Sequence, residues 1–189
     1  MLVLVRHGST EWSETGKHTG TTDVALSEKG RRQAAMLREP LARFEFGLVL
    51  TSPLSRARET CEIAGLGERA RVEPGLREFE YGDYEGITTD EIRRTRPAWS
   101  VWRDGAPGGE TPDRVGERAD GVIARALEAG GDVALFAHGH LLRVLGARWL
   151  ELPGAYGGNL GLGTAAMCEL GYERERRAIW LWNDTHHLR

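Results

Sequence analysis

The sequence predicts an α/β protein with a largely parallel sheet between layers of helices. Two observations support this fold class: short apolar runs of strand length recur along the chain, and segments with helical periodicity lie between them. Alternation of strand and helix is typical of a parallel sheet whose faces helices cover. The clearest predicted strands, each a compact apolar run, are 2–5, 46–51 and 132–137.

Two further strands are predicted near the end of the chain. Residues 165–170 and 178–182 are apolar, and the charged segment 172–177 separates them. Such a segment suits a hairpin turn or a long loop.

The predicted helices are marked by capping residues and apolar stripes. One helix is expected over Ser27–Phe44, beginning with a capping serine. Ser52-Pro53 and Thr111-Pro112 each place a proline directly after a cap, which is the usual start of a helix. A further apolar stripe follows His138. The Gly/Pro-rich stretch 104–110 is interpreted as a mobile cover inside the domain.

Composition limits the classes of function. The 189 residues suit a single domain, 1–189, and a formal net charge of −3 argues against nucleic acid or a membrane surface as partner. The only cysteines, Cys61 and Cys168, form no CxxC pattern, which argues against disulfides and structural zinc. The short apolar start does not resemble a signal peptide, so a cytoplasmic location is expected.

Charged motifs follow three of the predicted strands directly. They are Arg6-His7-Gly8, the segment that contains Arg56, and His138-Gly139-His140. In an open α/β sheet ligands bind outside the carboxyl ends of the strands. If the three strands are neighbours, two arginines and two imidazoles meet at one place.

This cluster suits a phosphate group. Guanidinium groups match phosphate oxygens, and phosphoryl transfer depends mainly on positioning and on stabilising charge. A neutral imidazole can attack phosphorus, and His7 is the better nucleophile candidate, between Arg6 and a glycine turn. His138 would then be a cationic or hydrogen-bonding partner of the phosphoryl oxygens. This chemistry requires neither a metal nor a cofactor.

The leaving oxygen needs a proton. The segment 76–86 offers three carboxylates beside aromatic residues, Glu78, Glu80 and Glu85. Apolar surroundings and neighbouring carboxylates raise the pKa of a carboxyl group, as a general acid requires. The residues alone do not choose among the three.

Four blocks in order resemble the histidine phosphatase superfamily, also called phosphoglycerate mutase-like: LVRHGSTEW, SPLSRARET, LREFEYGDYEG and FAHGH. The resemblance implies a three-layer α/β/α sandwich, with His7 as the phosphorylated nucleophile and Glu78 as the acid. It places Arg6, Arg56 and His138 around the phosphate. Further substrate contacts are expected from Ser13, Thr19, Gly20, Tyr81, Gly139 and His140.

Within the superfamily the chain looks closest to sedoheptulose-1,7-bisphosphatase-like sugar phosphatases. The related mutases carry a lysine shortly after the acid block, at a position that falls near Thr89 here, and an adjacent arginine pair that the 99–111 segment lacks. The resemblance therefore favours hydrolysis of a small phosphorylated metabolite, of the sugar phosphate or bisphosphate class, over mutase-type transfer.

Two other functions compete with a histidine phosphatase as interpretations of these residues. A metal-dependent hydrolase could use His138 and His140, whose spacing metal sites can adopt, but two arginines would repel a cation. A phosphate-binding module without catalysis would need neither nucleophile nor acid.

Trp99 and Trp102 are expected to close over the ligand. The late strand 180–182 could support a homo-oligomer.

Overall fold

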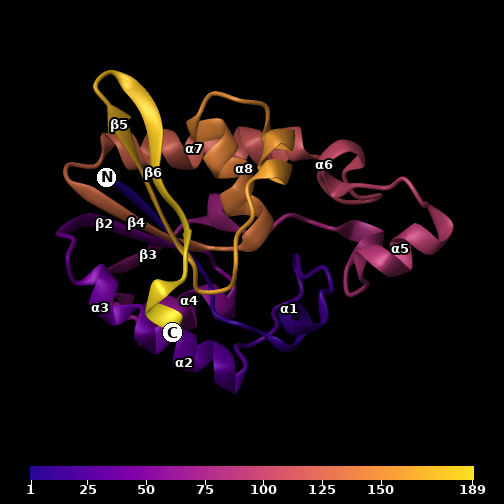
Figure 1. The fold of residues 1–189 in the computed structure, drawn as a ribbon, viewed down its shortest axis with the longest axis horizontal. Helices are drawn as coiled ribbons and strands as arrows, with labels where there is room; N and C mark the ends of the chain where they lie inside the picture. The colour runs from indigo at the N-terminus through magenta and orange to yellow at the C-terminus, as the bar shows by residue number, and fades with distance from the viewer.

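A six-stranded sheet forms the centre of the computed structural model, which describes residues 1–189 (Figure 1). The strand order is β3-β2-β4-β1-β5-β6. The first four strands in this order pair in parallel, whereas β5 and β6 form an antiparallel hairpin at one edge. The strands are β1 (Leu2–Arg6), β2 (Phe46–Thr51), β3 (Ala70–Val72), β4 (Asp132–Ala137), β5 (Met167–Glu173) and β6 (Arg176–Asp184).

Helices cover both faces of the sheet. In Figure 1, α7 and α8 lie on one face, and α2, α3 and α4 lie on the other. The predicted three-layer α/β/α sandwich with a mostly parallel sheet is therefore confirmed. The helices are α1 (Glu11–Thr15), α2 (Glu28–Met36), α3 (Arg38–Leu41), α4 (Ser55–Ile63), α5 (Thr89–Thr95), α6 (Val101–Asp104), α7 (Pro112–Glu128) and α8 (Gly139–Trp149). Short 3₁₀ turns occur at 67–69, 74–76, 82–84, 154–159 and 186–188.

Alternating strand residues build the two cores. Leu2 and Leu4 of β1 belong to the cluster that includes α7 and α8, whereas Val3 and Val5 belong to the cluster on the opposite face. All four side chains are buried. A strand buried on both faces explains why this segment is continuously apolar rather than alternating.

The helix predicted over Ser27–Phe44 is correct at its start and wrong in its continuity. The Ser27 hydroxyl caps α2 by accepting from the Gly30 N–H. The chain then breaks at Leu37 into α2 and α3. Pro40 has no N–H to donate to the carbonyl of Met36, so the α-helical hydrogen bond that would join the two helices cannot form.

Ser52 does not cap a helix as predicted. The helix α4 begins at Ser55, with Leu54 at the cap position. The Ser52 hydroxyl accepts from the Leu54 N–H at 3.3 Å and also contacts His138. The Thr111-Pro112 start of α7 is confirmed, with the threonine accepting from the Arg114 N–H.

The late hairpin is longer than predicted. The strands continue through the charged segment, so that only Arg174 and Glu175 form the turn, and Arg174 has a left-handed φ of 55°. The turn projects from the protein, where charged side chains remain hydrated. The short edge strand β3 was not predicted, since three mostly exposed residues carry little apolar signal.

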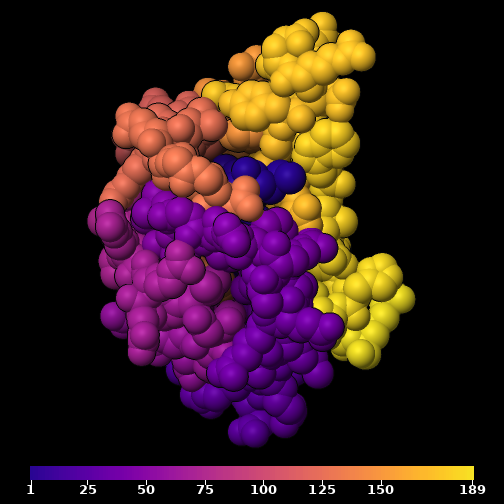
Figure 2. All heavy atoms as spheres, turned by 90° about the vertical axis from the view of Figure 1, so that its left-hand side faces the viewer, coloured from indigo at the N-terminus to yellow at the C-terminus, as the bar shows by residue number.

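The two ends of the sheet differ. At the carboxyl ends of the parallel strands, α1, α5 and α6 extend beyond the sheet (Figure 1). Figure 2 shows the opposite end, where the indigo N-terminal residues lie between the orange and yellow segments. The N-terminal ammonium donates to Asp132 Oδ1 at 2.8 Å there. None of the helices has the length and apolar character needed to cross a membrane.

Candidate active site

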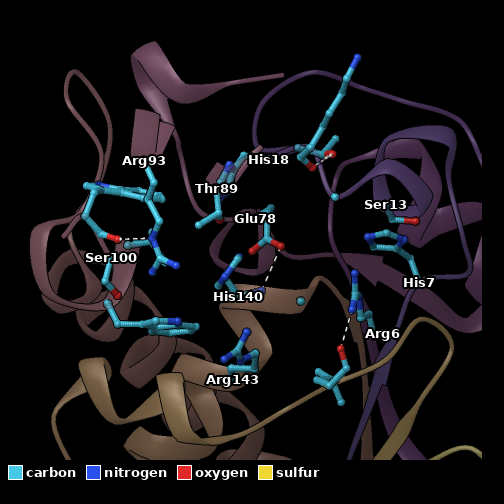
Figure 3. Close-up of a pocket in the computed structure, with 18 residues that line it drawn as sticks. Arg6, His7, Ser13, His18, Glu78, Thr89, Arg93, Ser100, His140 and Arg143 are labelled. Carbon is cyan, nitrogen blue, oxygen red and sulfur yellow. Dashed lines mark hydrogen bonds between the residues drawn. The ribbon is translucent and has the colours of Figure 1, made fainter. Parts of the chain in front are cut away.

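A pocket of about 370 Å³ opens at the carboxyl ends of the parallel strands. Figure 3 shows Arg6, His7 and Ser13 at one side of it, and Arg93 and Ser100 at the other. Glu78 lies between these two groups. We call the first side the phosphate end and the second the far end.

His7, at the end of β1, holds a fixed tautomer. Its Nδ1 lies 2.7 Å from the Gly8 carbonyl oxygen, which can only accept a hydrogen bond, so Nδ1 carries the proton. The lone pair is then on Nε2. Burial lowers the pKa of His7 well below its usual value, and the charges of Arg56 and Arg6 lower it further. His7 is therefore a neutral imidazole with a free Nε2.

The chain next to His7 requires two glycines. A Cβ on Gly8 would lie 2.3 Å from the carbonyl oxygen of Gly30 in α2, and a Cβ on Gly30 would lie 2.0 Å from the Ser9 carbonyl oxygen. This backbone contact fixes the end of β1 against α2.

The Arg6 side chain extends past the start of α8, so that its guanidinium group lies beside Gly139. Its Nη1 donates to the Leu162 carbonyl at 2.5 Å, while its buried Nε has no partner in the protein. A Cβ at Gly139 would lie 3.2 Å from the Arg6 Cζ. Gly139 therefore leaves room for the guanidinium group, and an unpartnered buried N–H beside the pocket is suited to an anion.

Arg56, on α4, is fully buried and connects the other parts of the cluster. Its Nε donates to His138 Nδ1 at 3.1 Å, and its Nη atoms donate to the carbonyls of Thr19, Gly20 and Thr22. These bonds use four of the five N–H groups that a guanidinium has, which leaves one on Nη1.

His138 lies directly behind His7, with ring centroids 5.1 Å apart. Because Nδ1 accepts from Arg56, the proton is on Nε2, which lies 2.7 Å from the Ser52 hydroxyl. Burial, with the charge of Arg56, lowers the pKa of His138 well below its usual value. Because the ring is neutral and neither nitrogen is left for a phosphoryl oxygen, these contacts favour a role for His138 in holding Arg56. They also occupy both ring nitrogens, which argues against the metal-site hypothesis.

Glu78 is the only one of the three candidate acids that lines the pocket. Its carboxylate accepts from the backbone N–H groups of Phe79, His140 and Leu141, at 2.9, 3.1 and 2.9 Å. The backbone N–H groups at the start of α8 therefore hold this carboxylate. The side chain is 6% exposed.

Glu80 and Glu85 have other positions. Glu80 pairs with Arg77 at the surface, at 3.3 Å. Glu85 accepts from the N–H groups of Gly20 and Thr22. The segment 19–22 is therefore held from two sides, with its carbonyls on Arg56 and its N–H groups on Glu85.

The predicted substrate contacts divide into two groups. Those that line the pocket are Ser13, Thr19, Gly139 and His140. Gly20 and Tyr81 lie behind the pocket wall: Gly20 is held by Arg56 and Glu85, and the Tyr81 hydroxyl bonds to His140 Nδ1. Arg56 and His138 also lie behind the wall, against His7.

A family model for the histidine phosphatase superfamily (branch 1) matches residues 2–185. The chain belongs to this superfamily. An acid phosphatase of Mycobacterium tuberculosis is 40% identical over 98% of this chain and 93% of its own length. The sedoheptulose 1,7-bisphosphatase of Saccharomyces cerevisiae is 36% identical over 88% of this chain and 70% of its own.

Solved structures agree with this assignment. The product of an open reading frame of M. tuberculosis has a TM-score of 0.92, 40% identity and 96% coverage of both chains. A mycobacterial glucosyl-3-phosphoglycerate phosphatase in complex with VO3 has a TM-score of 0.86, 34% identity, and coverage of 97% of this chain and 98% of its own. The protein is a phosphatase, although phosphoglycerate mutases are also among its relatives.

The far end of the pocket in this histidine phosphatase is cationic. Arg93 of α5 and Arg143 of α8 lie on this side of Glu78, and Lys17 also lines the pocket. Arg143 lies over the Trp102 ring at 4.3 Å and donates to the carbonyls of Gly157 and Gly158. Sequence reasoning missed these three residues. Arg143 was detectable, since it lies one helical turn beyond His140 on the same face of α8.

The cover of the pocket differs from the prediction. Residues 104–110 do not line it; they pack on 80–83, where the Glu80 N–H donates to Glu110 and the Asp83 N–H donates to the Pro107 carbonyl. The walls at the far end come from α5 and α6 instead. Trp102 lines the pocket, and Trp99 both lines it and belongs to the core, at 2% exposure.

Proposed function

We propose that this phosphatase hydrolyses a small sugar phosphate or bisphosphate through a phosphohistidine intermediate on His7, without a metal or cofactor. The observation that carries the proposal is the neutral imidazole of His7, with its Nε2 free, among two arginines at the phosphate end.

In the first step His7 Nε2 attacks phosphorus, and the bond from phosphorus to the ester oxygen breaks. The Nε N–H of Arg6 donates to the phosphoryl oxygens, and the positive charge of Arg56, which lies behind the pocket wall against His7, stabilises their negative charge at longer range. The protonated carboxyl of Glu78 gives its proton to the departing oxygen, so that an alcohol leaves.

In the second step water attacks the phosphohistidine. The Glu78 carboxylate takes a proton from this water, phosphate departs, and His7 returns to its neutral form with Nδ1 still donating to Gly8. His138 orients Arg56 through the bond from Arg56 Nε, and Ser52 fixes the ring of His138.

The cationic far end supports a substrate with a second anionic group. Arg93 and Arg143 lie on the side of Glu78 away from His7 (Figure 3). A guanidinium group suits a second phosphate or a carboxylate. Two relatives are named for substrates that carry such groups, a sugar bisphosphate and a glucosyl phosphoglycerate.

A panel of phosphorylated metabolites, with phosphate release as the readout, tests the substrate class. We expect the highest kcat/KM for sugar bisphosphates or sugar monophosphates, and equal activity with chelator present. Isomerisation of 3-phosphoglycerate that depends on its bisphosphate cofactor, without net phosphate release, would contradict hydrolysis and favour the mutase alternative.

The covalent step is tested by replacing His7. His7→Ala should reduce turnover by a factor on the order of 10⁴ or more, because loss of a nucleophile removes the covalent route. Rapid quenching of the wild type with a ³²P-labelled ester should yield acid-labile, base-stable label on the protein, and His7→Ala should yield none. Wild-type turnover in the variant would end the proposal.

We also propose that residues 1–189 act as one catalytic domain, since β1, β4, α4 and α8 all contribute to one cluster. A homo-oligomer through the edge strand β6 remains a prediction, supported by the 54% exposure of Trp180. Light scattering in solution measures the oligomeric state directly.

A further inference from the structure

Two histidines border the middle of the pocket, on either side of Glu78 (Figure 3). They are His18, from the segment after α1, and His140, from the start of α8. Their rings are nearly parallel, with centroids 6.3 Å apart and an interplanar angle of 23°. The mechanism above uses neither of them.

His18 presents a hydrogen-bond acceptor. Its Nδ1 lies 2.7 Å from the Ile87 carbonyl, which also accepts from the His18 backbone N–H at 3.0 Å. Because a carbonyl only accepts, Nδ1 carries the proton and Nε2 carries the lone pair. The ring packs against Tyr81 and Trp99, and Nε2 has no partner within the protein.

His140 presents a hydrogen-bond donor. Its Nδ1 lies 2.5 Å from the Tyr81 hydroxyl, which is buried and has no other partner. If this hydroxyl accepted from Nδ1, its own hydrogen would be buried without an acceptor, which is costly. The hydroxyl therefore donates to Nδ1, and the proton of His140 is on Nε2.

Both imidazoles are neutral. Burial lowers the pKa of His18, against an opposing effect of its bond to Ile87 and of the nearby Glu78 and Glu85 charges. Burial also lowers the pKa of His140 well below its usual value, and the charges of Arg143 and Arg6 act in the same direction. Two neutral rings suit an uncharged polar group better than an anion.

We propose that His18 and His140 form a hydroxyl-recognition pair that selects phosphate esters of polyhydroxylated alcohols. An alcohol hydroxyl satisfies both rings, because it donates to His18 Nε2 and accepts from the Nε2–H of His140. A phosphate dianion or a carboxylate only accepts hydrogen bonds, so it cannot donate to His18. The pair lies beside Glu78, so the hydroxyl that it binds is one near the ester oxygen of the substrate. This inference rests on the proposed function and specifies its substrate class.

The test compares two esters that differ only in hydroxyl groups. Ribose 5-phosphate and tetrahydrofurfuryl phosphate share the ring and the leaving alcohol type, but the second lacks all ring hydroxyls. For the wild type we expect kcat/KM to favour ribose 5-phosphate by a factor of about 10² or more, because a site built to bind a hydroxyl rejects the analogue without it.

The variant His18→Phe keeps a ring against Tyr81 and Trp99 but removes the acceptor. We expect it to lower this preference at least tenfold. Tyr81→Phe should also lower it, because His140 Nδ1 loses its donor and the tautomer is no longer fixed. The matched control is His187→Phe, a histidine outside the pocket that contacts the Ala165 carbonyl, and it should keep the wild-type preference.

The outcomes separate this inference from the proposed function. An unchanged preference in both His18→Phe and Tyr81→Phe, with folded proteins and full hydrolysis of ribose 5-phosphate, would overturn the hydroxyl-recognition pair alone. A wild type that releases phosphate from both esters at equal rates would do the same. Absence of phosphate release from every sugar phosphate in the panel would instead overturn the proposed function.

Discussion

The two ends of the pocket are built differently. At the phosphate end, Arg56 and His138 are fully buried, and their polar atoms are bonded to other parts of the protein. At the far end, Arg93 is exposed and comes from α5, and Ser100 directly precedes α6. The first end is positioned by the sheet, whereas the second depends on peripheral segments.

This difference indicates a division of labour. Positioning by strands and by buried hydrogen bonds gives the accuracy that phosphoryl transfer requires. Exposed segments can change in sequence without disturbing that geometry, so they are suited to substrate selection. Changes at the phosphate end should therefore affect every ester, and changes at the far end should affect only esters with a second anion.

Glu78 lies between the two ends of the pocket, and Glu78→Gln should lower kcat more than the substitutions at the far end or at Glu85. With an alkyl phosphate, we expect kcat to fall by about 10² to 10⁴, because the leaving alkoxide loses its proton donor. With p-nitrophenyl phosphate, whose leaving group needs no proton, the loss should be much smaller. Steady-state kinetics with both esters measures the difference, and equal losses would exclude Glu78 as the general acid.

Arg93→Gln tests the far end. We expect KM for a sugar bisphosphate to rise about 10- to 100-fold, in keeping with the loss of a charge-assisted hydrogen bond. The KM for the matching monophosphate should change little. Arg58→Gln, on the exposed side of α4, is the matched control. A uniform rise in KM for both substrates would show that the two ends are not separable in this way.

Stability at acid pH tests the burial of the histidines in and around the pocket. The pKa values of His7, His138 and His140 are all well below normal in the folded protein, so below about pH 6.5 the unfolded chain binds more protons. Stability is therefore present above this pH and is lost as the pH falls. Each histidine contributes a slope of about 1.4 kcal/mol per pH unit.

Urea unfolding between pH 7.5 and 5 measures this slope. Replacing one of the three histidines, as in His140→Phe, should reduce it by the contribution of one residue. Constant stability across this range would contradict the neutral, buried state assigned to these rings.

The smallest effect is expected for Glu85→Gln, which weakens the hold on residues 19–22. The Gly20 and Thr22 N–H groups lose a charged acceptor, and Arg56 is held less firmly through the same segment. We expect the transition state to lose about 1 kcal/mol of stabilisation, which corresponds to a roughly fivefold lower kcat with little change in KM. Glu80→Gln, at the surface, should keep wild-type kcat, and an equal loss in both variants would argue against the positioning role.

Much of the fold could be predicted because its signals are local. The apolar runs of β1, β2 and β4 match their observed bounds within a residue, since each is buried on both faces. Where the prediction failed, a single residue or a distant contact decided the outcome. Pro40 divides one predicted helix into two. The Ser52 hydroxyl forms a hydrogen bond with His138 and does not cap a helix.

The sequence by itself determined the sheet, the placing of Arg6, His7 and His138 at strand ends, and the superfamily, because these are properties of short segments and their order. Only the tertiary structure decided which of three glutamates enters the pocket, where the hydrogen bonds of Arg56 go, and that His18 faces His140. These outcomes depend on contacts between segments up to 122 positions apart, from His18 to His140, and no local pattern encodes such contacts.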